Sequence, residues 1–202
     1  MNACDGTPSN ADEPVEVAAL VDALRAGERW APAALFDRYG HYVRAIVLHV
    51  LGPRSDATDV LHDVFVTAFE DIHQLKNPQA LRGWLASIAV FRSKNYLRSR
   101  RRFGLLFSAP DVRVVRPPSP ATPAVSAALR SAYEVLDELD VEERIPFVLR
   151  AVQGFSLDEV AEACGVSLAT AKRRVASARA TFIRLSSERP LLREWLGDNA
   201  HD

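Results

Sequence analysis

The chain has 202 residues, 48% of them hydrophobic, and a formal net charge of −1. This length suits one large or two small domains, and the apolar content excludes an intrinsically disordered chain. No run of about 18 apolar residues occurs, so no membrane insertion is expected. Residues 1–14 are polar and acidic. They lack the basic start and apolar stretch of a signal peptide, which predicts a disordered tail and a cytoplasmic protein.

The first half of the chain is predicted to form a four-helix domain over residues 15–103. Apolar residues recur there at three- and four-residue steps, the period of an amphipathic helix. The predicted helices cover residues 15–26, 33–51, 56–75 and 81–102. Gly52 and Pro53 end the second helix, and Pro78 interrupts the chain before the fourth. Alternation typical of strands is absent throughout.

A proline-rich segment follows this domain. Five prolines fall between residues 104 and 124, with serine and threonine among them. Proline removes backbone donors and disfavours a helical residue before it, so this range is predicted to be an extended, flexible linker.

The second domain is predicted over residues 125–187, with helices at 129–139, 142–153, 156–164 and 168–186. Asp140 is expected to cap the second of these helices, Ser156 with Glu159 to form a capping box, and Ser167 to cap the last. The fold class is therefore all-α: two small helical domains, an N-terminal four-helix domain and a C-terminal helix-turn-helix domain, joined by a Pro-rich linker. Residues 188–202 form a C-terminal extension with a short helix expected around residues 191–195, and the sequence suggests no function for it.

Positive charge is concentrated in two places. Residues 82–102 carry seven Lys or Arg and no acid, and residues 172–184 carry five and no acid. The acids gather elsewhere, including residues 134–162. A solvated helix face normally mixes both signs, so two basic islands on an acidic chain favour two contacts with a polyanion.

The second island lies in a helix-turn-helix pattern. A short capped helix is followed by Gly165, which supplies the turn, and then by a longer basic helix. Ala161 allows the two helices to approach closely, and Val166 is expected to pack between them. The N-terminal part of the second helix enters the major groove in such motifs. Its predicted DNA-contacting residues are Ser167, Thr170, Lys172, Arg173, Arg174 and Ser177. The alternative is a helical hairpin with a basic surface.

These residues resemble a known family. The runs GFSLDEVA (154–161) and GVSLATAKRR (165–174), with LDELDVEERIPF (136–147) before them, are similar to the fourth conserved region of extracytoplasmic-function sigma factors. ALFDRY (34–39), DATDVLHDVF (56–65) and LRGWL (81–85) through the arginines at 100–102 resemble the second region of the same family. The match covers about residues 15–187, in the family's order.

The resemblance implies a function and an assignment of sites. Such a protein is not an enzyme: it binds core RNA polymerase and promoter DNA and promotes DNA melting. The helix-turn-helix residues given above would bind the minus-35 element. The minus-10 element would be bound by Asn77, Gln79, Arg82, Arg92, Lys94, Arg98, Arg100 and Arg101, and core polymerase by Asp56, Asp59, His62 and Asp63. An anti-sigma factor is expected as a further partner, by resemblance only.

Opening DNA needs a basic groove and a place for an unstacked base. The helix after Pro78 supplies the charge, and the polar side chains of Asn77 and Gln79 could read a flipped base. Trp84 falls on the apolar stripe and is predicted to belong to the core.

Two alternatives from other classes remain open at this point. A helix-turn-helix repressor or activator would explain the second basic island but not the first. A metalloenzyme is suggested by two acid-x-x-His spacings, Asp59 to His62 and Glu70 to His73, although sites of this kind draw the motif from different helices. Cys4 and Cys164 have no second Cys or His at ligand spacing, so no metal and no cofactor is predicted. Cys164 is expected to be a small buried residue.

Overall fold

The computed structural model describes residues 14–52, 56–104 and 123–193, and all regular structure within these ranges is helical. The N-terminal domain contains four α-helices and two short 3-10 helices: α1 (Pro14–Arg25), α2 (Ala31–Leu51), α3 (Ala57–Asp71), η1 (Ile72–Gln74), η2 (Pro78–Ala80) and α4 (Leu81–Gly104). The C-terminal domain contains α5 (Pro123–Glu138), α6 (Val141–Ala151), α7 (Leu157–Cys164) and α8 (Leu168–Ser187). The predicted all-α class with two helical domains is confirmed.

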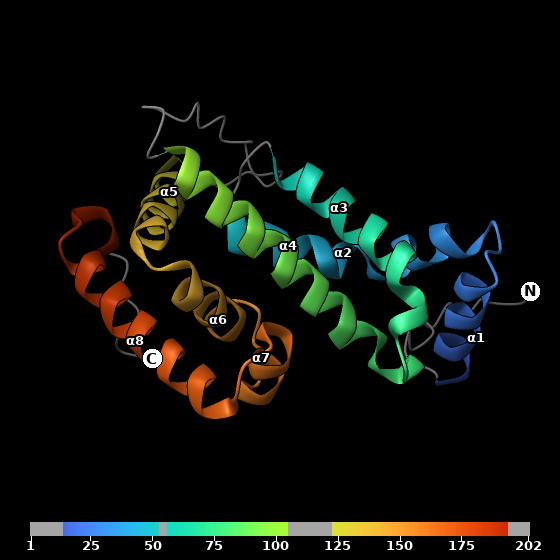
Figure 1. The fold of residues 1–202 in the computed structure, drawn as a ribbon. Coiled ribbons are helices and arrows are strands. Elements are labelled where there is room, and N and C mark those ends of the chain that lie inside the picture. The colour runs from blue at the N-terminus through green and yellow to red at the C-terminus, as the bar shows by residue number, and fades with distance from the viewer. Residues whose placement is uncertain (1–13, 53–55, 105–122, 194–202) are drawn as a thin grey trace, which may run out of the picture.

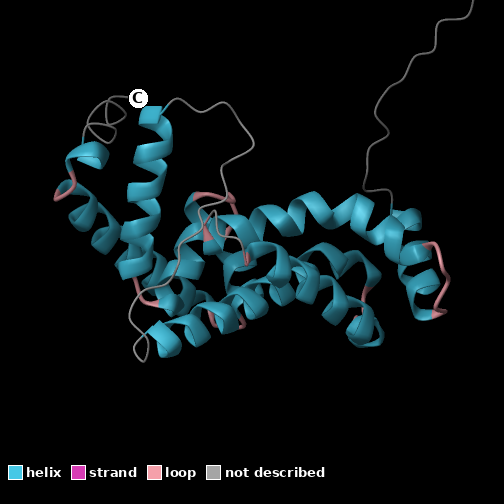
Figure 2. Cartoon of the chain, turned by 90° about the horizontal axis from the view of Figure 1, so that it is seen from above, coloured by secondary structure: helices cyan, strands magenta, loops and turns pink. Residues whose placement is uncertain are grey.

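The long helix α4 runs between the two domains (Figure 1). It packs against α2 and α3 of its own domain and against α6 and α7 of the other. Figure 2 shows the same elongated arrangement from above. The buried residues of both domains form one continuous hydrophobic cluster. The two domains are therefore packed together.

Two aromatic residues depart from the apolar stripes that the helical period predicts. The period over residues 81–102 includes Phe91, and that over residues 33–51 includes Phe36, but their side chains are 56% and 50% exposed. Ala86 and Val90 of α4 are buried outside the predicted stripe, because α2 and α3 of the same domain and α6 and α7 of the other domain pack against this helix.

Several predicted boundaries are corrected by the structure. The third helix was expected to reach residue 75, but α3 ends at Asp71 and continues as the 3-10 helix η1. Pro123 lies within the range predicted as linker, yet it begins α5, because proline is tolerated in the first turn of a helix. Pro14, assigned to the tail, begins α1. Gly104 and Ala124 of the predicted linker also lie in helices, and the rest of the predicted tail and linker lies outside the described residues.

The C-terminal extension is helical at residues 190–193, and the rest of the predicted helix there lies outside the described residues. Arg189 pairs with Glu134 and Glu138, at 2.6 and 2.5 Å, and so ties the start of the extension to α5. Leu192 is buried beside this connection. Within the described ranges, none of the helices has the length and apolar character that crossing a membrane requires.

Candidate nucleic-acid interface

The helix-turn-helix has the local geometry that its sequence predicts. The Ser156 hydroxyl accepts from the Glu159 backbone, and the Glu159 carboxylate accepts from the Ser156 backbone at 2.7 Å, which completes the capping box. Gly165 ends α7 with φ +63°, a left-handed conformation that favours glycine. Ser167 caps α8 by accepting from the Thr170 backbone N–H at 3.2 Å. The N-terminus of α8 is therefore fixed relative to α7.

The polar residues of the α8 N-terminal half divide into two groups. Ser167, Lys172, Arg173 and Ser177 are exposed, and Thr170 is half-buried with its hydroxyl 2.9 Å from that of Ser167. Arg174 is different, because its side chain is only 23% exposed and forms an ion pair with Glu142 of α6. An exposed basic face therefore begins directly after the cap, and Arg174 lies behind it.

The cations of α4 are engaged to different degrees. Arg92 donates to the Thr67 hydroxyl, at 2.9 Å from Nε and 2.5 Å from Nη2, and so joins α3 to α4 within the N-terminal domain. Lys94, Arg98, Arg100 and Arg101 reach across to the C-terminal domain instead. In the first basic island, Arg92 thus makes a contact inside the N-terminal domain, whereas the other four cations contact the C-terminal domain.

The partners of these cations are three acids around the end of α5 and the start of α6. We call Asp137, Asp140 and Glu142 the acidic turn. Glu142 Oε1 lies 2.7 Å from Lys94 Nζ and 2.6 Å from Arg98 Nη2, and its Oε2 lies 3.1 Å from Arg174 Nη1. The other two acids bind the end of α4: Arg100 is 3.8 Å from Asp137, and Arg101 is 3.5 Å from Asp140 and also donates to the Leu139 carbonyl.

The charge of Glu142 is maintained by these contacts. Partial burial acts to raise the pKa of its carboxyl, but the hydrogen bond from Lys94 and the charges of Lys94, Arg174 and Arg98 outweigh burial, so the pKa is lowered. A carboxyl with a lowered pKa stabilises the folded chain above its unfolded pKa, and this contribution is lost as the pH falls through the folded value. At neutral pH the Glu142 carboxyl is therefore ionised.

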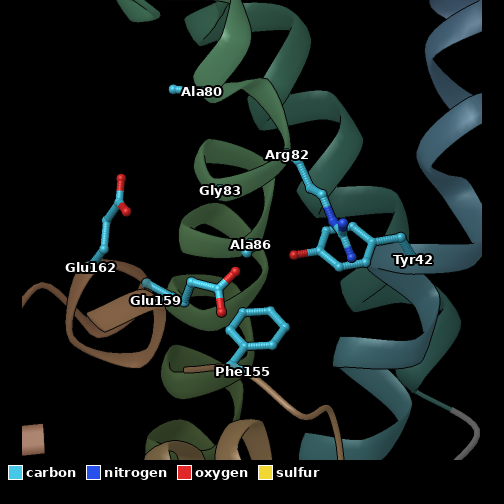
Figure 3. Close-up of a pocket in the computed structure, with 9 residues that line it drawn as sticks. Tyr42, Ala80, Arg82, Gly83, Ala86, Phe155, Glu159 and Glu162 are labelled. Atoms are coloured by element: carbon cyan, nitrogen blue, oxygen red, sulfur yellow. The ribbon is translucent and has the colours of Figure 1, made fainter. Parts of the chain in front are cut away.

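Nearer the start of α4 the two domains meet around a cavity of about 260 Å³ (Figure 3). The guanidinium of Arg82 lies over the Tyr42 ring, 4.6 Å from its centroid, and Tyr42 stacks on Phe155 at 6.4 Å. Burial raises the pKa of the Tyr42 hydroxyl, and the Arg82 charge partly opposes this shift. Glu159 and Glu162 line the same cavity. This end of the contact thus combines an aromatic pair with charged side chains from both domains.

The half-buried imidazole of His49 in α2 contacts Gln153, which follows the end of α6. The Gln153 side-chain amide nitrogen is 2.5 Å from His49 Nδ1, so the neutral ring accepts a hydrogen bond there. Desolvation by burial lowers the pKa of His49 below its ordinary value of 6.5. The folded protein with its domains packed together therefore favours the neutral form of the His49 ring.

We expect the free energy of unfolding to fall as the pH drops below about 6.5, because the unfolded chain then binds the proton that folded His49 resists. His49→Gln should flatten this part of the profile. The measurement is urea unfolding of both proteins at pH 7.5, 6.5 and 5.5. An unchanged slope in the variant would mean that His49 does not carry this pH dependence.

The connector before α4 is locally ordered. Asn77 Oδ1 accepts from the Gln79 backbone N–H at 3.0 Å and caps η2. Both side chains are exposed. Trp84 is half-buried and packs against the hydrophobic core, as predicted from its position on the stripe.

The predicted polymerase-docking residues share one face of α3. Asp59, His62 and Asp63 are all exposed, at the three- and four-residue spacing of neighbours on a helix surface. Val66, one turn further on, is also exposed. Asp56, at the N-terminal boundary of the helix, accepts a hydrogen bond of 2.6 Å from the Tyr96 hydroxyl of α4. The sequence reasoning had assigned Asp56 to docking without foreseeing this bond.

Across the described residues, no three His, Cys, Asp or Glu side chains come together in a way that could hold a metal ion. Cys164 is half-buried, and burial raises the pKa of its thiol to about 11. The thiol is thus in its protonated, weakly reactive form at neutral pH.

Sequence reasoning missed the acidic turn as a part of the site. The signal was present, since acids gather in residues 134–162 while the first basic island has none. Charge patterns along a chain do not show which segments meet, however, and an acid in the first turn of a helix, such as Glu142 in α6, also has a local role in the helix dipole.

The helical architecture agrees with comparisons to known proteins. Residues 35–103 match the family model for sigma-70 region 2, and residues 129–182 match that for sigma-70, region 4. The chain is 30% identical over 173 residues to RNA polymerase sigma factor NccH of Alcaligenes xylosoxydans xylosoxydans, covering 83% of this chain and 92% of that protein. It is 30% identical over 168 residues to ECF RNA polymerase sigma factor SigM of Mycobacterium tuberculosis, covering 83% of each. To the ECF RNA polymerase sigma-E factor of Escherichia coli it is 26% identical over 183 residues, covering 79% and 88%.

Two solved structures show the same fold. CnrH in complex with the cytosolic domain of CnrY aligns with a TM-score of 0.62 at 24% identity, covering 85% of this chain and 97% of that one. The sigma factor RpoE of Bartonella quintana, in complex with the anti-sigma factor NepR, aligns with a TM-score of 0.55 at 22% identity, covering 85% and 94%.

A helix-turn-helix domain packed beside a basic helical domain, with both matching family models in order, defines a sigma-70 family transcription factor. Within that family the chain belongs to the extracytoplasmic-function sigma factors of RNA polymerase. It is a transcription initiation factor that binds core polymerase and promoter DNA, and it is not an enzyme. The repressor and metalloenzyme alternatives are therefore set aside.

Proposed function

We propose that the exposed face at the start of α8 reads the minus-35 element. The observation that carries this assignment is the exposure of Lys172, Arg173 and Ser177 directly after the Ser167 cap. Arginine can pair bidentately with guanine in the major groove, whereas lysine acts mainly as a point charge on phosphate. Ser167, Thr170 and Arg174 complete the proposed set. The corresponding domain is residues 125–187.

Arg173→Ala should reduce binding to the upstream element by about 1–3 kcal/mol and relax its sequence preference, as expected for a base-reading arginine. The measurement is transcription in vitro from a panel of minus-35 mutants with core polymerase. Arg179→Ala, an exposed change later on the same helix, is the matched control. A uniform loss across the panel would instead assign Arg173 to phosphate, and wild-type transcription from every template would remove it from the interface.

The N-terminal domain, residues 15–103, is proposed to bind the minus-10 element and core polymerase. The exposed amides of Asn77 and Gln79 would hold a base of the melted strand, and Arg82, Lys94, Arg98, Arg100 and Arg101 would contact its backbone. Arg92 is assigned to the same surface from the sequence, and its bonds to Thr67 support a role in positioning α4. Melting then depends on binding energy alone, with the chemistry left to the polymerase.

Core polymerase is proposed to dock on the α3 face formed by Asp59, His62 and Asp63, with Asp56 at its edge. Asp59→Arg should reduce association with core polymerase and leave the fold intact. Asp59 lies in the first turn of α3, so the change also removes a helix-dipole interaction of about 0.3–1 kcal/mol. The pull-down with core polymerase is therefore combined with thermal melting of the same variant, which measures any loss of stability.

Glu70→Arg, at the exposed far end of the same helix, is the control for this charge reversal. Asp59→Arg should lose core polymerase while Glu70→Arg retains it. Equal retention by both variants would remove this face from the docking surface.

An anti-sigma factor is proposed as a regulatory partner. The support is that both solved structures of similar fold are complexes, one with the cytosolic domain of CnrY and one with the anti-sigma factor NepR. Co-purification with the product of a neighbouring gene would test this partnership.

A further inference from the structure

The cavity at the start of α4 has the size of a small-molecule site (Figure 3). Helices α2, η2 and α4 of the N-terminal domain line it together with α7 and the residue Phe155 of the C-terminal domain. Its volume of about 260 Å³ equals roughly eight or nine times the ~30 Å³ that a water molecule occupies in the liquid. A ligand of about nine non-hydrogen atoms is therefore of matching size.

The inner wall of the cavity is apolar and made of short side chains. Ala86 of α4 and Ala163 of α7 are buried, and Phe155 beside them is 8% exposed. Gly83 lies one turn before Ala86 on α4 and has no side chain to fill the space. This wall suits a short apolar group, whose burial is favourable in water.

The rim of the cavity carries charges of both signs. Arg82, Glu159 and Glu162 line the cavity and are exposed to solvent. Figure 3 shows both carboxylates on the α7 side and the guanidinium beside Tyr42. A ligand at this rim therefore meets negative charge from one domain and positive charge from the other.

The two carboxylates have oxygens available to a ligand. Glu159 uses Oε2 to accept from the Ser156 backbone at 2.7 Å, which leaves Oε1. Hydrogen bonds from Ser156, aided by the charge of Arg82, lower the pKa of the Glu159 carboxyl, so it is ionised at neutral pH. Among the described residues, none donates a hydrogen bond to the Glu162 carboxylate or pairs with it.

These charges select the class of ligand. An anion would be repelled by two carboxylates, and a simple amine would be repelled by Arg82. A zwitterion satisfies both sides, because its ammonium group donates charge-assisted hydrogen bonds to carboxylates and its own carboxylate accepts them from a guanidinium. The apolar inner wall adds a preference for a short aliphatic side chain.

We propose that this cavity binds a small aliphatic α-amino acid, with the ammonium group at the two glutamates of α7, the carboxylate at Arg82 and the side chain against the buried alanines. L-leucine has the matching size. The proposal goes beyond promoter recognition, and it does not depend on the assignment of DNA contacts. Because both domains line the cavity, the bound amino acid stabilises the folded chain and raises its melting temperature.

The first experiment titrates the full chain with L-leucine and follows the melting temperature. We expect a dissociation constant on the order of 1 mM, because ion pairs at an exposed rim contribute little. Two matched probes are 3-methylbutylamine, which lacks the carboxylate, and 4-methylpentanoate, which lacks the ammonium group. Each should bind about tenfold more weakly, the loss expected for a missing charge-assisted hydrogen bond. No shift with L-leucine, or equal shifts with all three compounds, overturns the proposal.

The second experiment places the ligand in the cavity. Gly83→Leu should abolish the shift, because a Cβ at Gly83 would lie 3.9 Å from Glu162 Oε1 and a longer side chain there extends between α4 and α7. Leucine is also a better helix former than glycine, so the variant should remain folded. A Gly83→Leu protein that responds to L-leucine as wild type does would place the ligand elsewhere and overturn the site.

Glu162→Gln removes one proposed partner of the ammonium group and should weaken L-leucine binding about tenfold. Asp158→Asn is its matched control, since Asp158 is an exposed acid of the same helix that does not line the cavity. Arg82→Met should bind L-leucine and 3-methylbutylamine equally well. Equal binding by Glu162→Gln and Asp158→Asn, or a retained preference for L-leucine in Arg82→Met, contradicts the proposed orientation of the zwitterion and overturns it.

Discussion

Asp137→Ala is expected to destabilise the protein by about 1–3 kcal/mol, the usual cost of taking an acceptor from a buried donor. Arg144 is 2% exposed, and its guanidinium donates to the Asp137 carboxylate, which is itself 35% exposed. Without that carboxylate, a buried positive charge loses one group that compensates its desolvation. Urea unfolding followed by circular dichroism measures the loss.

The partner substitution separates charge from packing. Replacing Arg144 with methionine in the Asp137→Ala background should recover a large part of the lost free energy, since an apolar side chain of similar length needs no counter-ion. A double variant whose loss equals the sum of the two single losses would mean that the pair is not energetically coupled.

Gly52→Ala is expected to destabilise the protein by about 1–3 kcal/mol through backbone strain alone. Gly52 ends α2 with φ +86° and ψ 176°, a region that only glycine adopts readily. A Cβ there would also lie 3.0 Å from Tyr133 Cδ1 of α5, in the other domain. The variant should therefore loosen the contact between the domains as well as the end of α2.

Tyr133→Leu is the test of this second effect. Removing the ring relieves the crowding but not the strain, so the double variant Gly52→Ala/Tyr133→Leu should lose less stability than the two single losses add up to. Gly27→Ala is the control, because Gly27 has φ +72° but nothing within 4 Å of an added Cβ. Equal losses at both glycines would show that crowding by Tyr133 contributes nothing.

The local structure could be predicted from sequence because its causes are local. The Ser156 capping box, the Gly165 turn and the Ser167 cap each depend on groups within four residues of one another. Helix positions followed from apolar periodicity for the same reason. Boundaries were less accurate where a helix changes type, as at Ile72, since the transition to a 3-10 helix leaves no distinct pattern.

The contact between the domains could not be predicted in this way. Glu142 and Lys94 are 48 residues apart, and the sequence around each of them predicts only a charged residue on the surface of its own helix. The burial of Ala86 and Val90 has the same origin, because the buried arc of α4 is widened by a second domain that the sequence of this helix does not identify. The predicted DNA-binding cations follow from the basic clusters in the sequence, whereas their carboxylate partners follow only from the tertiary structure.

The continuous hydrophobic cluster has a consequence for the lifetime of the protein in a cell. Phe155 and Ala163 of the C-terminal domain are buried beside the cavity that faces α4, so separating the domains exposes apolar surface there. Proteases act on transiently opened forms in proportion to their population when opening is fast. The strength of the contact between the domains therefore sets how often this apolar surface becomes accessible to proteases.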